Sequence, residues 1–269
     1  YSYENSWGMS GWVVDGFYDE EFFNCYGGFK NQLKTNIDVI GVQDDFSKYK
    51  IIVIPNHRIT TSEQAEKIKA FVKGGGIVIM NSESGTRDEN NQQYEMLAPC
   101  VFSEMCGCSV SGRVSADNLR NHSGESAVEF SDGTKSDLTC QIDALKADSA
   151  EAIAFYTSGR LKGTPAITVN DYGDGKAILY GFNGCDVYFY EALAKETAKM
   201  FSLSPIINAD DGILVSSRKA ADGEYIFAVN MKDSPNKIHI ESDAADMISD
   251  EKISGDFTLK PYQTIVFRK

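Results

Sequence analysis

The sequence has few basic residues for its length, and this shortage argues against two classes of protein. Lys and Arg together number 26 against 39 Asp and Glu, which gives a formal charge of −13 and a pI near 4.7. Such a negative field repels nucleic-acid phosphates and anionic lipid. The chain also lacks an apolar run near the about 20 residues that a membrane helix needs. We therefore expect no nucleic-acid partner and no membrane partner, whereas a sugar or a protein face fits the charge.

Cysteine is also sparse, and its spacing follows no disulfide framework. A chain of 269 residues with 42% hydrophobic residues can bury a sizeable core without disulfide bonds. We expect reduced thiols in a cytoplasmic protein. Zinc sites normally pair two closely spaced ligands with a second ligand pair, and no second pair is evident here, so we expect no metal and no cofactor. The six cysteines are Cys25, Cys100, Cys106, Cys108, Cys140 and Cys185.

Histidine occurs three times, so general bases are few. Ser84 precedes Gly85 after an expected strand, at the place where amidotransferase-like enzymes carry a nucleophile. Its surroundings do not match the small-x-nucleophile-x-small turn of such enzymes. A pairing of Ser84 with His57, which follows a neighbouring strand, stays open as an alternative. The sequence contains no complete catalytic constellation.

The first hundred residues alternate strands and helices. Residues 37–42, 51–54 and 77–80 are apolar and are expected as strands, the last two buried on both faces. A helix between them is predicted to begin with a capping box of Thr60 and Glu63. Two successive strand–helix units indicate a flavodoxin-like, doubly wound, mostly parallel sheet. Residues 171–175 have the composition of a hairpin turn.

The pattern changes to period two after residue 205. Short strands are expected over residues 213–217, 224–230, 237–241, 257–259 and 264–267. Residues 206–269 are therefore predicted to form a small antiparallel β-sandwich behind an α/β domain of residues 1–205. The chain opens at Tyr1 with no initiator Met or leading segment, and we expect it to continue a longer polypeptide.

Several motifs occur in the order found in family 42 glycoside hydrolases. The chain resembles the C-terminal portion of a β-galactosidase of that family on residues 4–7, 46–55, 74–76 with 84–90, 163–166 with 172–176, and 261–264. The resemblance covers nearly the whole chain. It departs from the family pattern at Cys106-Gly107-Cys108, and at Gly8, where the family has a second Trp. The Gly8 departure puts an inherited sugar contact in doubt.

The resemblance implies a fold, partners and a function. It implies a trimerisation domain of class I glutamine-amidotransferase-like fold followed by the β-sandwich. The catalytic glutamates of the family lie in a preceding (β/α)₈ barrel, which this chain lacks. We therefore expect a non-catalytic assembly region whose partners are itself, as a homotrimer, and the barrel of the parent chain. A galactoside substrate would be a partner of this chain only through that barrel.

One rim of the sheet carries the candidate site. We expect a first strand to end near Tyr3, a sheet order of 2-1-3-4, and loop roots of Trp7 and Ser84 about 10 Å apart. These loops would gather aromatic and charged side chains against the barrel or a neighbouring subunit. They are Trp7, His57, Arg87, Asp88 and Glu89.

Two other functions remain open. The chain could be a stand-alone amidotransferase-like hydrolase that uses Ser84 with His57. It could also be a sugar-binding module without chemistry, because tryptophan faces stack on sugars. Trp7 would then be the contact residue.

Overall fold

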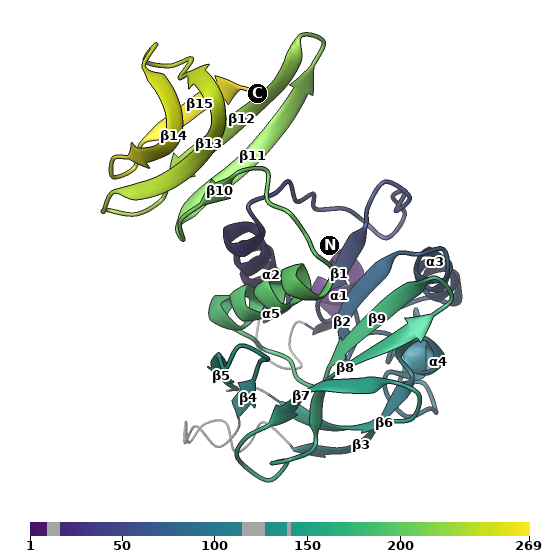
Figure 1. Cartoon of the computed structure of the whole chain (residues 1–269). Coiled ribbons are helices and arrows are strands. Elements are labelled where there is room, and N and C mark those ends of the chain that lie inside the picture. Colours follow the sequence, from purple (N-terminus) through teal and green to yellow (C-terminus); the bar gives the residue numbers. More distant parts are fainter. Residues whose placement is uncertain (10–16, 115–126, 139–140) are drawn as a thin grey trace. The chain divides into compact units, whose positions relative to one another are not determined.

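The chain folds into two compact units. The structure, a computed structural model, describes residues 1–9, 17–114, 127–138 and 141–269. Unit 1 consists of residues 1–25 and 39–189, and unit 2 consists of residues 26–38 and 190–269 (Figure 1). No described helix is long and apolar enough to cross a membrane.

A seven-stranded mixed sheet forms the centre of unit 1. The predicted strands at 51–54 and 77–80 are confirmed as β1 and β2, which lie parallel in register. The expected burial on both faces holds for β2, whereas β1 buries Ile52 and leaves its other residues half-buried. In order across the sheet the strands are β1 (Ile51–Ile54), β2 (Ile77–Asn81), β9 (Gly175–Tyr180), β8 (Pro165–Tyr172), β7 (Glu151–Tyr156), β4 (Ala127–Glu129) and β5 (Lys135–Asp137).

The prediction of a mostly parallel sheet is wrong. Only β1 with β2 and β2 with β9 pair in parallel, and the other four neighbouring pairs are antiparallel. The reason is the predicted hairpin, which is confirmed: residues 171–175 join β8 to β9, with Tyr172 opposite Gly175. A hairpin forces its two strands to run in opposite directions, so the parallel half of the sheet ends at β9.

The crossover between β1 and β2 is helix α3 (Ser62–Lys73), which lies beside the parallel strands (Figure 1). Its capping box uses Thr61 and Gln64, one residue later than predicted. The hydroxyl of Thr60 donates instead to the carbonyl of His57 over 3.0 Å. Helix α3 buries Ala65, Ile68 and Val72, and these apolar side chains pack in the core of unit 1.

The N-terminal segment is helical, which corrects a second prediction. Tyr3–Met9 forms α1, so no strand ends near Tyr3, and β1 has β2 as its strand neighbour in the described sheet. The predicted order 2-1-3-4 is therefore wrong, and residues 37–42 are also not a strand. Ser2 starts the helix, because its hydroxyl accepts the N–H of Asn5 over 3.2 Å in the manner of an N-cap.

A small antiparallel pair and a short helix complete the described part of unit 1. Strands β3 and β6 pair with a bulge between Val110 and Gly112. The 3₁₀ turn η1 and helix α4 lead into β3. These elements are η1 (Cys100–Phe102), α4 (Ser103–Cys106), β3 (Cys108–Val114) and β6 (Ile142–Ala147).

Unit 2 contains the β-sandwich predicted from the period-two pattern. All five predicted strands are present, in two three-stranded antiparallel sheets that share one apolar core. One sheet has the order β10-β13-β14 and the other β11-β12-β15. The strands are β10 (Asn208–Ala209), β11 (Ile213–Ala220), β12 (Gly223–Asn230), β13 (Asn236–Ala245), β14 (Lys252–Leu259) and β15 (Thr264–Arg268).

Parts of two helices belong to unit 2. Helix α2 (Phe17–Leu33) contributes from residue 26 onward, and α5 (Val187–Met200) from residue 190 onward. They cross closely, since a Cβ on Gly28 would lie 2.5 Å from the Cβ of Tyr190. The ammonium of Lys34 is buried and donates to the carbonyl of Ile213 in β11 over 2.8 Å. The segment after α2 is thereby fixed to the sandwich.

Candidate functional site

The loops after β1 and β2 leave the sheet at the same edge, because the two strands are parallel. Backbone hydrogen bonds hold these loops together: Gly85 N donates to His57 O over 2.9 Å, and Arg87 N donates to Arg58 O over 2.9 Å. Ile59 and Arg87 form a parallel bridge beyond the strands. We call residues 55–59 and 82–93, together with α1, the rim.

Helix α1 is attached to the rim through Asn5. Its side-chain oxygen accepts the N–H of Ile59 over 2.8 Å, and its nitrogen donates to the carbonyl of Ile59 over 3.1 Å. The amide of Asn91 donates to the carbonyl of Gly8 over 3.5 Å. These contacts position Trp7, which follows Asn5 in the helix.

Trp7 and Tyr3 form an exposed aromatic pair on α1. Their ring centroids lie 5.9 Å apart, and the side chains are 72% and 64% exposed respectively. Large aromatic side chains that neither fill a core nor meet a described neighbour on their outer faces are typical of interaction surfaces. Trp7 therefore lies on the rim, as a helix residue rather than in the predicted loop.

His57 belongs to the rim, but its side chain is buried. Its Nδ1 lies 3.2 Å from the side-chain nitrogen of Asn5, and among the described residues its Nε2 has no hydrogen-bond partner. Burial lowers the pKa of His57 to about 4, so the imidazole is neutral near pH 7. This buried ring supports α1 and is not presented to solvent.

The three charged residues predicted for the rim follow β2. Arg87 donates through Nη1 to the carbonyl of Asn91 over 2.8 Å. The carboxylate of Asp88 accepts the N–H groups of Asn90 and Gln92 over 3.0 and 2.8 Å, which folds the loop into a turn. Glu89 is exposed. The structure thus brings all five predicted residues to one edge. The side chain of His57 is buried there, and the carboxylate of Asp88 is bonded to backbone N–H groups of its own loop.

Ser84 and His57 do not form a catalytic pair. The hydroxyl of Ser84 donates to the carbonyl of Ile54 and to the side-chain oxygen of Asn81, over 3.2 and 2.9 Å. It accepts the backbone N–H of His57 over 3.1 Å, whereas the imidazole Nδ1 faces Asn5. Ser84 is also fully buried. A nucleophile needs a base on its hydroxyl and access to substrate, and this serine has neither.

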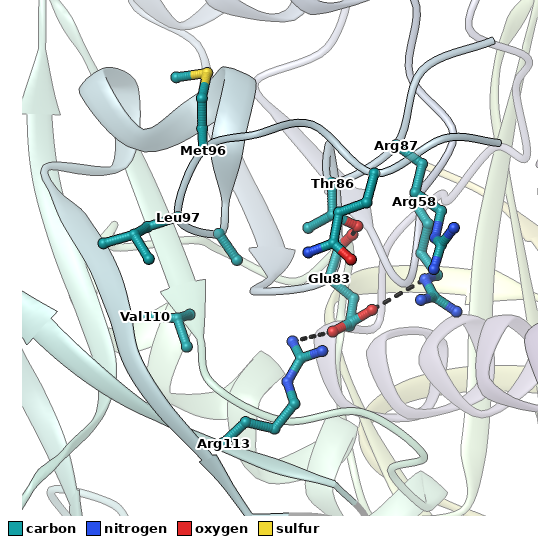
Figure 2. A pocket seen from close by; sticks show the side chains of 10 residues that line it. Arg58, Glu83, Thr86, Arg87, Met96, Leu97, Val110 and Arg113 are labelled. Carbon is teal, nitrogen blue, oxygen red and sulfur yellow. Dashed lines mark hydrogen bonds and ion pairs between the residues drawn. The ribbon is translucent and has the colours of Figure 1, made fainter. Parts of the chain in front are cut away.

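An ionic network that we did not predict lies beside the rim, with buried carboxylates and a partly exposed arginine, Arg113. The carboxylate of Glu83 forms ion pairs with Nε of Arg58, over 2.9 Å, and with Arg113 (Figure 2). Arg113 also binds Asp143 through two nitrogens, over 2.7 and 3.0 Å. Ser82 donates to the same carboxylate over 2.7 Å. The network joins the loop after β2 to β3 and β6.

A pocket of about 250 Å³ opens against this network. Its lining combines guanidinium groups, one carboxylate and two neutral polar side chains with an apolar set. Leu97 and Val110 lie across the pocket from Arg58 (Figure 2). The lining residues are Arg58, Glu83, Thr86, Arg87, Gln93, Met96, Leu97, Ala98, Val110 and Arg113. The sequence carried one signal for it, a carboxylate at residue 83 directly after a buried strand.

The cysteines carry no chemistry of their own in the described part of the chain. Five are buried and form no disulfide bond, and Cys140 lies outside the described residues. Burial raises the pKa of the Cys108 thiol to about 11, which keeps it protonated and unreactive. Among the described residues no group of three or more His, Cys, Asp or Glu side chains could hold a metal ion.

Family models match nearly the whole chain. A model described as "Beta-galactosidase trimerisation domain" matches residues 1–204, and one described as "Beta-galactosidase C-terminal domain" matches residues 212–269.

Individual relatives agree with the family models. Beta-galactosidase Pbg of Clostridium perfringens is 28% identical over 280 residues, which cover 100% of this chain and 40% of the relative. Beta-galactosidase GalA of Bacillus licheniformis is 26% identical over 98% of this chain and 39% of the relative. The chain therefore spans about 40% of the length of these curated relatives.

Solved structures show the same fold. The crystal structure of a β-galactosidase from Bacillus circulans sp. alkalophilus has a TM-score of 0.88 at 24% identity, covering 100% of this chain and 40% of that one. A catalytic mutant of a GH42 β-galactosidase from G. stearothermophilus has a TM-score of 0.86, also at 24% identity, over 100% and 39% of the two chains.

Proposed function

Because this chain belongs to the glycoside hydrolase family 42 β-galactosidases and carries their trimerisation and C-terminal domains, we propose that it joins three copies of one such enzyme. Residues 1–205 are assigned to assembly and residues 206–269 to the β-sandwich. The parallel strands β1, β2 and β9 with α3 are taken as the flavodoxin-like, amidotransferase-like core. The setting is proposed as cytoplasmic.

The exposed aromatic pair of α1 is the observation that carries the proposal. Trp7 and Tyr3 offer two adjacent aromatic faces, and such residues anchor the centres of protein interfaces. Met96 and Leu97, after the loop that carries Arg87, Asp88 and Glu89, are also exposed. We assign this rim to the contact with a neighbouring subunit or with the barrel of the parent chain.

Catalysis is proposed to reside outside this chain. The described strands form one seven-stranded sheet and three smaller sheets, and not an eight-stranded barrel. Glycoside cleavage needs two carboxyl groups facing one another across an open sugar cleft. The buried carboxylates Glu83 and Asp143 are instead held by arginine. A parent chain with a preceding (β/α)₈ barrel is proposed to hydrolyse β-galactosides.

The test is the mass of the purified chain in solution. Sedimentation equilibrium is expected to give three times the chain mass, and Trp7→Ala is expected to shift the distribution towards monomer. Tyr262→Ala is the matched control, because Tyr262 is an equally exposed aromatic residue in the sandwich. A monomer at high concentration would overturn the assembly role of this chain. The same preparation is expected not to hydrolyse a chromogenic β-galactoside, and turnover abolished by a Glu or Asp substitution would contradict that.

A sugar-binding module is the second candidate, favoured by the same exposed tryptophan. Aromatic faces stack on sugar rings, and Trp7 with Tyr3 offers such a platform. Galactose would then change Trp7 fluorescence saturably in a Trp12→Phe background. A linear, unsaturable response would exclude this function and leave assembly as the role of the pair.

A further inference from the structure

A second pocket lies in unit 2, where strand β10 stops pairing with β13. Its volume is about 290 Å³, and it is lined by residues 204–208, by residues 239–242, and by Phe267 and Lys269. All of these residues belong to unit 2, so the pocket belongs to the sandwich and its linker. It shares no lining residue with the pocket beside Glu83.

The short pairing of β10 explains why the pocket is open. Strand β10 pairs with β13 through residues 208 and 209 only. The chain before β10 turns away from β13, because Ile206 N donates to the carbonyl of Lys34 over 3.0 Å. Among the described strands, the edge of β13 from Ile240 onward therefore has no neighbour on this side.

Strand β13 is also irregular at this place. Its pairing with β14 shifts register between Ile240 and Ala244, so that residues 241–243 face the single residue Ser254. Such a bulge redirects side chains out of the regular alternation of a strand and is common beside functional sites. The first two residues of the bulge line the pocket.

The pocket contains polar side chains that are available to a ligand. Within the described part of the chain, five of them form no hydrogen bond or ion pair: Ser204, Asn208, Glu241, Ser242 and Lys269. His239 is oriented by Asp256, since its Nδ1 lies 2.8 Å from a carboxylate oxygen. A carboxylate only accepts, so Nδ1 carries the proton and the other nitrogen of a neutral ring accepts. The lining thus offers both donors and acceptors.

This lining favours a neutral ligand with several hydroxyl groups. An anion would meet the carboxylate of Glu241 and a cation would meet the ammonium of Lys269, so an ion of either sign meets a like charge. A hydrocarbon would cover the polar side chains without bonding to them, which costs free energy. A hydroxyl group both donates and accepts, and it can therefore bond to each polar side chain present.

The apolar part of the lining and the volume narrow the ligand further. Pro205, Ile206 and Phe267 line the pocket and can cover the C–H groups of a ring. A volume of about 290 Å³ lies at the small end of the about 300–1,000 Å³ typical of ligand pockets. We propose that this pocket binds a single neutral pyranose. The site is separate from Trp7 and does not require the assembly role. Only the choice of galactose as the probe rests on the proposed function.

Proton NMR of the imidazole groups tests the proposal on the purified chain. The chain has three histidines, and the signal of His239 is identified by its loss in His239→Gln. Galactose is expected to shift this signal saturably at constant pH. Sorbitol, an open-chain polyol, is expected to shift it much less at the same concentration. No saturable shift with galactose, or an equal shift with sorbitol, would overturn the proposal.

Variants connect the response to the pocket. Glu241→Ala and Asn208→Ala are each expected to weaken galactose binding about tenfold, because each removes a hydrogen-bond partner of a hydroxyl group. Glu251→Ala is the matched control, since it removes a carboxylate from an exposed position of the sandwich outside the pocket. Galactose binding that is unchanged in both pocket variants would contradict the site.

Two competing explanations give different results. If galactose binds the aromatic pair of α1 instead, Trp7→Ala weakens binding and Glu241→Ala does not. If the open edge of β13 binds an extended peptide, trialanine shifts the His239 signal saturably and galactose does not. Either result would overturn the assignment of a pyranose to this pocket.

Failure of this proposal is distinguishable from failure of the assembly role. Glu241→Ala is expected to leave the sedimenting mass of the chain unchanged. A trimer that does not bind galactose would remove the pyranose site and leave the assembly role. A monomer that binds galactose in the pocket would do the reverse.

Discussion

The side-chain nitrogen of Asn5 lies 3.2 Å from Nδ1 of His57, and both side chains are buried. An amide N–H can donate to an imidazole nitrogen only if that nitrogen carries no proton. When Asn5 donates to this nitrogen, the neutral ring carries its proton on Nε2. The contact also ties α1 to the loop that follows β1.

Asn5→Ala is expected to destabilise unit 1 by about 1–3 kcal/mol, because the backbone groups of Ile59 and the ring of His57 would lose buried partners. Urea unfolding measures the loss. Asn90→Ala, at an exposed position, is the control and is expected to change stability by less than about 0.5 kcal/mol. Equal effects of the two substitutions would contradict the role given to Asn5.

His57 makes stability depend on pH. Burial lowers its pKa to about 4, below the ordinary value of 6.5, so the unfolded chain takes up this proton first as the pH falls. The stabilisation is fully present above pH 6.5 and is lost between pH 6.5 and about 4. At about 1.4 kcal/mol per pKa unit the loss is roughly 3 kcal/mol.

The comparison uses two histidine variants across that pH range. In His57→Gln the free energy of unfolding is expected to fall less than in the unsubstituted chain between pH 6.5 and 4. His239→Gln is the control, because His239 is half exposed, and it is expected to keep the loss. If the free energy of unfolding falls with pH equally in His57→Gln and in the unsubstituted chain, His57 does not cause the loss.

Glu83→Gln is expected to cost about 3–5 kcal/mol, because it leaves the guanidinium groups of Arg58 and Arg113 without their shared carboxylate. Glu89→Gln removes the same charge from an exposed position and is expected to be nearly neutral. Unfolding by urea, which is uncharged, measures both variants without adding salt. A loss below about 1 kcal/mol in Glu83→Gln would show that the network adds little.

Gly28→Ala is expected to destabilise unit 2 by about 1–3 kcal/mol, even though alanine favours a helix by about 1 kcal/mol over glycine. The new Cβ would lie 2.5 Å from the Cβ of Tyr190 and 2.8 Å from the backbone nitrogen of Glu191. Gly112→Ala is the control, since its nearest neighbour is 4.0 Å away. A more stable Gly28→Ala variant would mean that α2 and α5 can separate.

The hydrophobic pattern of neighbouring residues was enough to predict most of the strands. Strands β1 and β2 were apparent from continuous apolar runs, and β11 to β15 from the alternation of apolar and polar residues that burial on one face leaves. The capping box was misplaced by one residue, since Thr60 and Thr61 are both good caps. Helix α1 was missed because the Ser2 cap is followed by aromatic residues that also favour strands.

The candidate site was predictable only in part. His57 and Arg87 were assigned to one edge from the parallel pairing of β1 and β2, which is a short-range feature of the chain. Trp7 was assigned to the same edge from a strand expected to end near Tyr3, and that segment is a helix. The partners of the Glu83 network were not predicted, because Arg113 and Asp143 come from β3 and β6, and Asp143 lies 61 residues beyond Ser82. Long-range ion pairs leave no periodicity in a sequence.

The division of α2 between the two units sets an order of events during synthesis. Residues 26–38 belong to unit 2, yet the whole of residues 39–189 is made before the rest of that unit leaves the ribosome. Until β11 emerges, the ammonium of Lys34 has no Ile213 carbonyl to bind. Unit 1 can collapse early. The sandwich can contact residues 26–38 only after the intervening residues have been made, and closing this long loop costs conformational entropy, which makes the step slow. A nascent chain that stops before residue 213 therefore cannot yet bind the ammonium of Lys34 to β11.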